Sequence, residues 1–298
     1  MTKKKRLKDL TIKHNFMFGA VMCDEENCRE LLERVLNFPI ERVEVSKEKS
    51  ILYHPEYKGV RLDVYAKDEK GTHYDIEMQA LQKSSIVKRS RYYHSQMDME
   101  FLLSGEDYDK LPNSYVIFIC DFDPFEEKKY CYTFENLCLE NRELHMNDGC
   151  KTIFLSTKGE NDEEVPKSLV RFLKYVNAGL SESMDDFGDE FVAKLQQSVQ
   201  HIKESREMED RFMLFQELLR DERAEGRAEG LAEGLAEGRA EGLTSGRANS
   251  VLLLLEEKGV IPEDLREKIM SEKDTEVLEK WLKLAAKTDS IEQFLKEM

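Results

Sequence analysis

The repeat in the C-terminal third limits most strongly what this chain can fold into. From Arg223 to Gly242 a four-residue unit, Arg or Leu followed by Ala-Glu-Gly, occurs five times in succession, and a degenerate copy follows at 243–246. Alanine and glutamate favour helix, but each glycine costs about 1 kcal/mol relative to alanine. Because an α-helix has about 3.6 residues per turn, a four-residue stripe drifts by about 40° per repeat. The repeat therefore predicts a marginal, exposed helix, either a solvated linker or an oligomerisation stalk.

The repeat separates regions of different composition. Upstream, the apolar pattern predicts an α/β domain over residues 1–158, and an acidic, amphipathic helical region follows over 159–222. The repeat with its flanking residues covers 223–249, and 250–298 predicts a small helical unit. We therefore expect an α/β domain followed by an α-helical tail.

The first region alternates helical and strand patterns, as expected for a sheet with helices on its faces. Apolar residues at three- and four-residue steps mark helices, and short apolar or alternating runs mark strands. The predicted elements are a helix over 10–37, strands over Val60–Ala66 and His73–Gln79, a basic helix over about 84–103, a buried central strand over Tyr115–Cys120, and further strands within 130–155.

The charge balance limits the classes of partner and compartment. Forty-five Lys and Arg against 61 Asp and Glu give a net charge of −16, which argues against general coating of nucleic acid. Residues 78–97 nevertheless contain four basic side chains and no acid, so the net charge conceals a basic patch. The six cysteines contain no C-x-x-C pair, and we find neither a signal peptide nor a membrane-length apolar run. We expect reduced thiols and a cytoplasmic protein without membrane association.

The two predicted strands of the hairpin place acidic side chains opposite each other. If the turn is centred on Lys70, Asp63 lies opposite Glu77, and Gln79 shares the face of Glu77 because alternate strand residues face the same side. Cross-strand Cβ atoms are about 4.5–5.5 Å apart, and like charges there are destabilising. The pair therefore needs a proton, a cationic side chain or a divalent metal. Mg²⁺ fits this geometry and can acidify a water for phosphodiester cleavage.

A second interpretation is a hairpin whose polar face is simply exposed to water, because many hairpins would match this pattern. The helix that follows favours a site. Lys88, Arg89 and Arg91 can neutralise phosphates next to a metal. Tyr92 either stacks on a base or packs under the sheet. Acidic ligands for a metal beside basic residues for a phosphate are typical of nucleases.

Five segments occur in a specific order and spacing: KHNFMFGAVM, GVRLDVYAKDEKGTHYDIEMQ, KRSRYYHSQMD, YVIFICDFDPF and YTFEN. Together they resemble the Rpn family of recombination-promoting nucleases and transposase-like proteins, over residues 10 to about 157. The resemblance implies the PD-(D/E)XK nuclease superfamily, whose restriction-endonuclease-like core is a mixed central sheet flanked by helices. It also implies a metal-dependent DNA endonuclease that promotes recombination, with Mg²⁺, or another divalent cation such as Mn²⁺ or Ca²⁺, as cofactor.

The same resemblance assigns roles to individual residues. Asp63 matches the metal-binding aspartate and Glu77 the second acidic ligand. Gln79 stands where many superfamily members have lysine and where the nearer family commonly has glutamine, whose amide can orient a water but carries no charge. The first helix often carries an acid just before its Phe-x-Phe segment, whereas this chain has His14 in that region, either a weak ligand or a surface residue.

Two alternatives to an active nuclease remain. His14 and the absence of a lysine motivate the first, a DNA-binding or regulatory protein on a nuclease fold that has lost catalysis. The other is a protein whose helical tail drives assembly, for example into a homodimer. In each case DNA is the expected partner of the nuclease-like domain.

Overall fold

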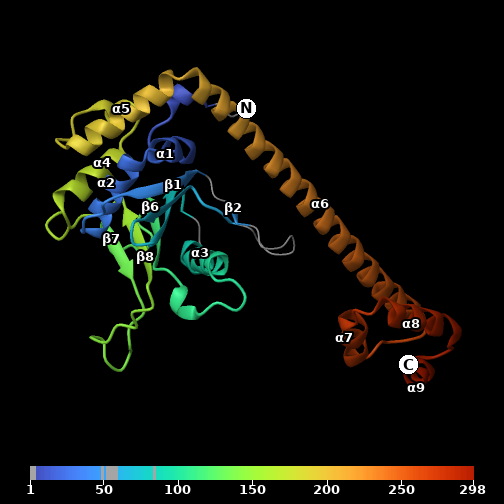
Figure 1. The fold of residues 1–298 in the computed structure, drawn as a ribbon. Coiled ribbons are helices and arrows are strands. Elements are labelled where there is room, and N and C mark those ends of the chain that lie inside the picture. Colours follow the sequence, from blue (N-terminus) through green and yellow to red (C-terminus); the bar gives the residue numbers. More distant parts are fainter. Residues whose placement is uncertain (1–4, 48–49, 52–59, 83–84) are drawn as a thin grey trace. The chain divides into compact units, whose positions relative to one another are not determined.

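A mixed six-stranded sheet organises the N-terminal part of the chain (Figure 1). The computed structural model describes residues 5–47, 50–51, 60–82 and 85–298. The strands, in spatial order, are β1 (Val43–Lys47), β4 (Val64–Asp68), β5 (His73–Gln79), β6 (Ser114–Cys120), β8 (Cys150–Ser156) and β7 (Cys131–Phe134). The central pairs β5–β6 and β6–β8 are parallel, and the outer pairs are antiparallel. The predicted α/β class with a mixed sheet is confirmed.

Helices cover both faces of this sheet (Figure 1). One face packs against α1 (Asn15–Met22), α2 (Glu25–Leu36), α4 (Lys167–Asn177) and α5 (Glu190–Glu204). The other face packs against α3 (Ile86–Phe101), which contributes Ile86, Tyr93 and Met97 to a second apolar cluster. Because both faces are covered, every residue of β5 is buried, and the apolar β6 is the predicted central strand.

The hairpin of β4 and β5 has the register expected from its turn. The Asp68 side chain accepts hydrogen bonds from the backbone N–H groups of Lys70 and Thr72, and Gly71 supplies a φ of 80°. Val64 therefore lies opposite Ile76. This is the pairing that places position 63 opposite position 77.

The strand predicted over Val60–Ala66 is wrong at its first half. β3 (Val60–Arg61) pairs with β2 (Ser50–Ile51) in a separate two-stranded sheet, and β4 begins only at Val64. Leu62 packs in the cluster under α3, whereas Val64 packs on the opposite face. The chain bends at residue 63, so the alternation of a single strand does not extend across it.

The helix predicted over 10–37 is interrupted. The first helical segment, α1, ends at Met22, and the side chain of Asp24 accepts a hydrogen bond from Asn27 N–H at the start of α2. Asn37 then adopts a left-handed conformation with φ of 57° and ends α2 two residues before Pro39.

The chain divides into two compact units, residues 1–215 and 216–298. The first unit does not end near residue 158, where the sequence suggested a boundary, because α4 and α5 bury Phe172, Phe191 and Leu195 in the core shared with the sheet. Phe212, near the start of α6 (Arg206–Glu256), joins the same core.

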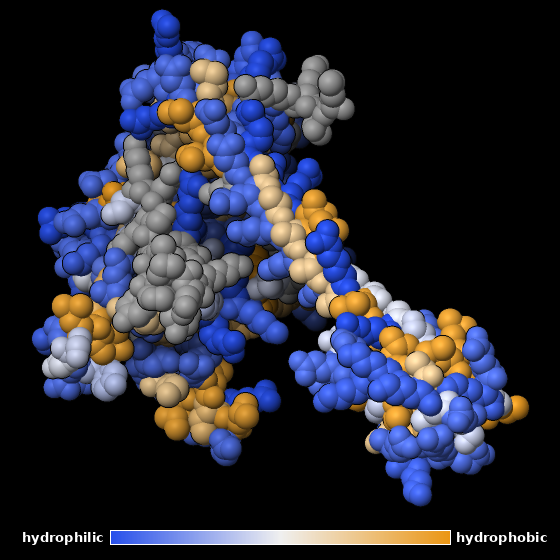
Figure 2. All heavy atoms as spheres, turned by 90° about the vertical axis from the view of Figure 1, so that its right-hand side faces the viewer, coloured by the Kyte–Doolittle hydropathy of each residue, from blue (hydrophilic) through white to orange (hydrophobic). Residues whose placement is uncertain are grey.

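Helix α6 includes all copies of the repeat, as predicted. The side chains of residues 223–243 are exposed, and a Cβ added at Gly230 or Gly234 would have nothing within 4 Å among the described atoms. In Figure 2 this segment shows charged side chains beside small, weakly hydrophobic ones. Among the helices described, none combines the length and the apolar composition that crossing a membrane requires.

The second unit is a small helical bundle. Its core contains Val251 and Leu255 from the end of α6 and residues from three short helices. These are α7 (Glu263–Ser271), α8 (Thr275–Lys287) and α9 (Ile291–Glu297). The side chains of Asp274 and Ser290 cap α8 and α9 by accepting hydrogen bonds from backbone N–H groups of the first turn.

Candidate active site

Asp63 and Glu77 meet where β5 approaches its carboxyl end. The backbone N–H of Asp63 donates to Glu77 Oε1 at 3.0 Å, and the backbone N–H of Met78 donates to Asp63 Oδ2 at 3.1 Å. Asn15, the first residue of α1, donates from Nδ2 to the same Asp63 oxygen at 3.4 Å. Each carboxylate thus accepts a main-chain hydrogen bond from the other side of the hairpin, and these two bonds fix the pair.

Glu77 and Gln79 face α3 and are removed from water. They are 3% and 8% exposed, so the interpretation of a hairpin with a solvated polar face is wrong. Gln79 Nε2 donates to Glu77 Oε2 at 3.3 Å, while its Oε1 accepts from Arg89 Nη1 at 3.2 Å. Both ends of the Gln79 amide are therefore used inside the site.

Arg89 forms an ion pair with Glu77. Its Nη2 lies 2.7 Å from Glu77 Oε2, and its side chain is 23% exposed. The guanidinium carbon lies 5.2 Å from the ring centres of both Tyr93 and Phe118. The basic cluster of the sequence predicts that Arg89 contacts DNA, whereas in the structure Arg89 points from α3 onto Glu77 and Gln79 of β5.

Asp75 adds a third carboxyl to this face. It is fully buried, and neither of its oxygens has a hydrogen-bond partner among the described residues. Burial, followed by the charges of Glu77 and Asp63, raises the pKa of Asp75 well above its ordinary value. Strand alternation places Asp75 on the face of Glu77, so this residue was recognisable from the sequence. Asn15 was not, because nothing in the sequence links the first helix to residue 63.

Burial also raises the pKa values of the other two carboxyls. The pKa of Asp63 rises from 3.8 to about 6, chiefly through burial and against the hydrogen bond from Met78. The pKa of Glu77 rises from 4.5 to about 8, through burial and then the charge of Asp63. Three acidic groups crowded beside one guanidinium form a site that favours an added proton or cation.

The donor set suits a hard divalent cation. Mg²⁺ is usually held by one or two protein carboxylates, with water and substrate oxygens completing its shell. Asp63 and Glu77 provide two such groups, and Asp75 adds a third carboxyl whose oxygens no donor among the described residues satisfies. Within the part of the chain that the structure describes, no group of three or more His, Cys, Asp or Glu side chains is arranged as a metal site. The described residues therefore suit a cation that is held by two protein carboxylates, those of Asp63 and Glu77.

The remaining predicted residues lie around this centre in different ways. Lys88 and Arg91 are exposed on α3, and Tyr92 is half-buried against the apolar cluster under that helix. His14 is half-buried. Its Nδ1 accepts from Phe16 N–H at the start of α1, and its ring packs edge-on against Phe212. Burial lowers the pKa of His14 to about 4, so the ring is neutral near pH 7.

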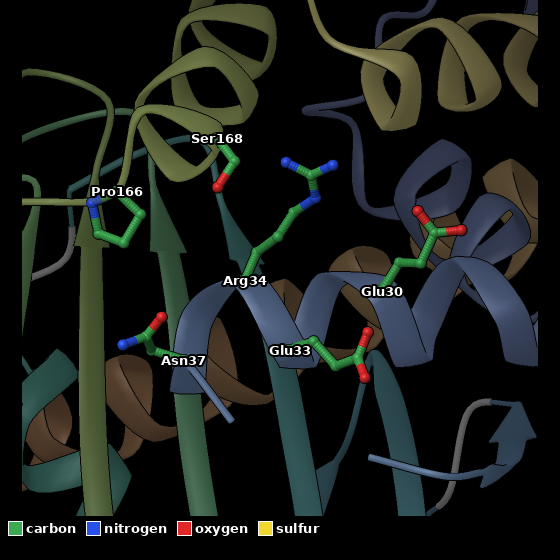
Figure 3. A pocket seen from close by; sticks show the side chains of 6 residues that line it. All are labelled: Glu30, Glu33, Arg34, Asn37, Pro166 and Ser168. Atoms are coloured by element: carbon green, nitrogen blue, oxygen red, sulfur yellow. The ribbon is translucent and has the colours of Figure 1, made fainter. Parts of the chain in front are cut away.

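A surface hollow elsewhere in the first unit contains none of these residues. It has a volume of about 290 Å³ and lies between α2 and the start of α4 (Figure 3). The lining residues are Glu30, Glu33, Arg34, Asn37, Pro166 and Ser168. Arg34 pairs with Asp189 at 3.0 Å, and Glu30 with Lys194 at 2.8 Å. Its charged side chains are thus already paired within the protein, and the hollow has no concentration of one charge.

Comparison with known proteins identifies a family for the greater part of the chain. The family model for PD-(D/E)XK nuclease family transposases matches residues 12–225. This range includes the whole sheet, α3 and the acidic residues described above. Searches of curated proteins and of solved structures found no match.

Proposed function

Because the chain belongs to the PD-(D/E)XK nuclease family of transposases, we propose that it is a metal-dependent DNA endonuclease whose cleavage of phosphodiester bonds promotes recombination. Family membership confirms the superfamily inferred from the sequence motifs. The observation that carries the proposal is the pair of half-buried Asp63 and buried Glu77, held across the hairpin by main-chain hydrogen bonds. Carboxylates of this kind are the ligands that hard divalent cations prefer.

In this proposal Asp63 and Glu77 hold Mg²⁺, or another divalent cation such as Mn²⁺ or Ca²⁺. The bound cation would supply an acidified water and neutralise charge that develops on the phosphate. The protein's own residues orient the two carboxylates: Met78 N–H and the Asn15 amide hold Asp63, and Asp63 N–H holds Glu77. Gln79 donates to Glu77 and so acts on the site through that carboxylate.

The exposed side of α3 is the proposed DNA contact. Lys88 and Arg91 present two positive charges to solvent on the helix that packs over the acidic centre, and Tyr92 lies beside them. Such charges bind the phosphate backbone without reading sequence and displace its counterions. Assembly into a homodimer through α6 is a further part of the proposal, supported by the exposed side chains of Leu231, Leu235 and Leu243.

The test uses supercoiled plasmid, purified full-length protein and Mg²⁺ or Mn²⁺, with EDTA as the metal control. We expect metal-dependent nicking or linearisation by the wild type and at least a 100-fold loss for Asp63→Ala, in line with the roughly 10²–10³-fold cost of removing one electrostatic stabiliser. DNA binding, measured by fluorescence anisotropy in EDTA, should be largely retained. Asp109→Ala, at an exposed position, is the matched control. Equal loss of cleavage and binding in a folded Asp63→Ala protein would contradict the assignment.

The second candidate is a DNA-binding or regulatory protein without catalysis. It is favoured by the ion pair between Arg89 and Glu77, which already compensates part of the negative charge. Plasmid that stays intact under all conditions, together with a gel shift and no measurable Mn²⁺ binding, would support this function instead.

A further inference from the structure

Arg89 differs from the other basic residues of α3 in the direction of its side chain. Ile86, Ser90, Tyr93 and Met97 form the buried stripe of this helix, and Arg89 lies on the same side because it is three residues from Ile86 and four from Tyr93. Lys88 and Arg91 fall on the opposite, exposed side. The helix therefore directs Arg89 toward the sheet and Lys88 and Arg91 toward solvent.

Two aromatic rings and two hydrogen-bond acceptors hold the Arg89 guanidinium. The rings, Tyr93 and Phe118, lie next to each other with their centres 6.2 Å apart and belong to the apolar cluster under α3. Its two terminal nitrogens donate to Glu77 and Gln79, which are two residues apart on β5 and so face the same side. A planar fork matches two acceptors in this way, whereas a lysine ammonium is a single point charge on a flexible stem.

These contacts make Arg89 poorly suited to a DNA phosphate. Turning the guanidinium toward solvent would break both hydrogen bonds and leave Glu77 buried beside Asp63 and Asp75 without its cation. Removing one partner of a buried charge pair is far more costly than removing an exposed charge. The side chain instead completes a closed arrangement with Glu77 and Gln79, in which Gln79 donates to Glu77 and accepts from Arg89.

We propose that Arg89 is a positioning residue, which fixes the orientation of the Glu77 carboxylate and the Gln79 amide and does not bind DNA. The inference rests on the proposed function, in which Glu77 is a ligand of the catalytic cation. Arg89 supplies the positive charge that Gln79, as an amide, lacks. Its effect on cleavage passes through Glu77, so it should alter the rate of the chemical step and leave DNA affinity nearly unchanged.

The kinetic test compares Arg89→Lys and Arg89→Ala with Arg91→Ala. The readouts are the single-turnover cleavage rate at saturating DNA and the DNA dissociation constant in EDTA. For both Arg89 variants we expect the rate to fall by about 100-fold, the size of effect that misplacement by about 1 Å can produce. Their dissociation constants should stay within about twofold of the wild type, whereas Arg91→Ala should weaken DNA binding and flatten its salt dependence.

Chemical rescue distinguishes a positioning role of Arg89 from a purely structural one. Guanidinium added at low millimolar concentration should recover part of the rate of Arg89→Ala and leave the wild type unchanged, while urea at the same concentration should not. A loss that falls on DNA affinity in the Arg89 variants, as in Arg91→Ala, would overturn the proposal.

A double-mutant cycle keeps the inference testable if the wild type cleaves no DNA, an outcome that refutes the proposed function alone. Unfolding is measured for Arg89→Ala, Glu77→Gln and the double variant. Coupling between contacting residues should change the unfolding equilibrium constant by about tenfold beyond the product of the single effects. Additive effects would show that Arg89 does not hold Glu77 and would overturn the proposal. Should Arg89→Ala not fold, Arg89→Lys replaces it in both measurements.

Discussion

Replacing Glu77 by glutamine should change the stability of the protein by an amount that rises steeply with pH. In the wild type Glu77 is 3% exposed and shares its face of the sheet with Asp63 and Asp75. Burial and the charge of Asp63 raise its pKa from 4.5 to about 8. Glutamine has nearly the same shape but no titratable proton, so the variant removes this one ionisation.

The sign follows from the proton balance of the two states. Between pH 4.5 and about 8 the folded chain retains a proton on Glu77 that the unfolded chain has lost, so the wild type loses stability as the pH rises. At about 1.4 kcal/mol per pKa unit, this loss is on the order of a few kcal/mol across the window. That is a large share of the roughly 5–15 kcal/mol that separates folded from unfolded domains. The free energy of unfolding of Glu77→Gln minus that of the wild type should therefore rise by this amount.

The difference between the two proteins is the useful quantity because other groups titrate in the same range. Burial lowers the pKa values of His14 and His94 from 6.5 to about 4, so both make the folded state more stable as the pH rises between these values. This contribution is common to the wild type and the variant and cancels. The lost contact with Arg89 adds an offset to the variant. Because the charge of Glu77 also helps to raise the pKa of Asp75, the slope with pH reports Glu77 together with this neighbour.

The assay is urea unfolding of the full-length protein in EDTA at several pH values from 5 to about 8.5, followed by far-ultraviolet circular dichroism. Trp281, the single tryptophan, lies in the second unit, so its fluorescence follows that unit separately. Glu41→Gln, which removes an exposed carboxyl, is the matched control and should give a flat difference. A flat or falling difference for Glu77→Gln would refute the reasoning, because it would mean that Glu77 ionises at least as easily in the folded chain as in the unfolded chain.

Two predictions concern the helical tail. Gly230→Ala and Gly234→Ala should each stabilise α6 by about 1 kcal/mol, because alanine is the better helix former and a Cβ at either position meets no described atom within 4 Å. A lower thermal midpoint by circular dichroism would instead indicate that the glycines contact a partner helix. The proposed homodimer predicts twice the monomer mass by light scattering for the full chain and the monomer mass for a chain that ends at residue 222. Equal oligomeric states of the two proteins would remove the role of the repeat in assembly.

The hairpin register was predictable because local chemistry determines it. Asp68 and Gly71 define a tight turn around Lys70, and once the turn is fixed the pairing of β4 with β5 follows along both strands. Alternation then places Glu77 and Gln79 on one face. The same reasoning could not reveal the bend at Asp63. Leu62 and Val64 are both apolar, so the pattern is that of one strand although the two side chains enter different clusters on opposite faces of the sheet.

The position of Arg89 shows where two sound sequence rules conflict. Helical periodicity places it on the buried stripe between Ile86 and Tyr93, but charge favours exposure, and a basic cluster next to an acidic pair is naturally read as one DNA-binding surface. The structure agrees with helical periodicity. Glu77 on the facing strand lies 2.7 Å from Arg89, and this pairing offsets the free-energy cost of burying a cation. An arginine in the apolar stripe of a helix that packs on an acidic strand face is therefore better assigned to the site than to the surface. Lys88 and Arg91, outside that stripe, keep the proposed role of contacting phosphate.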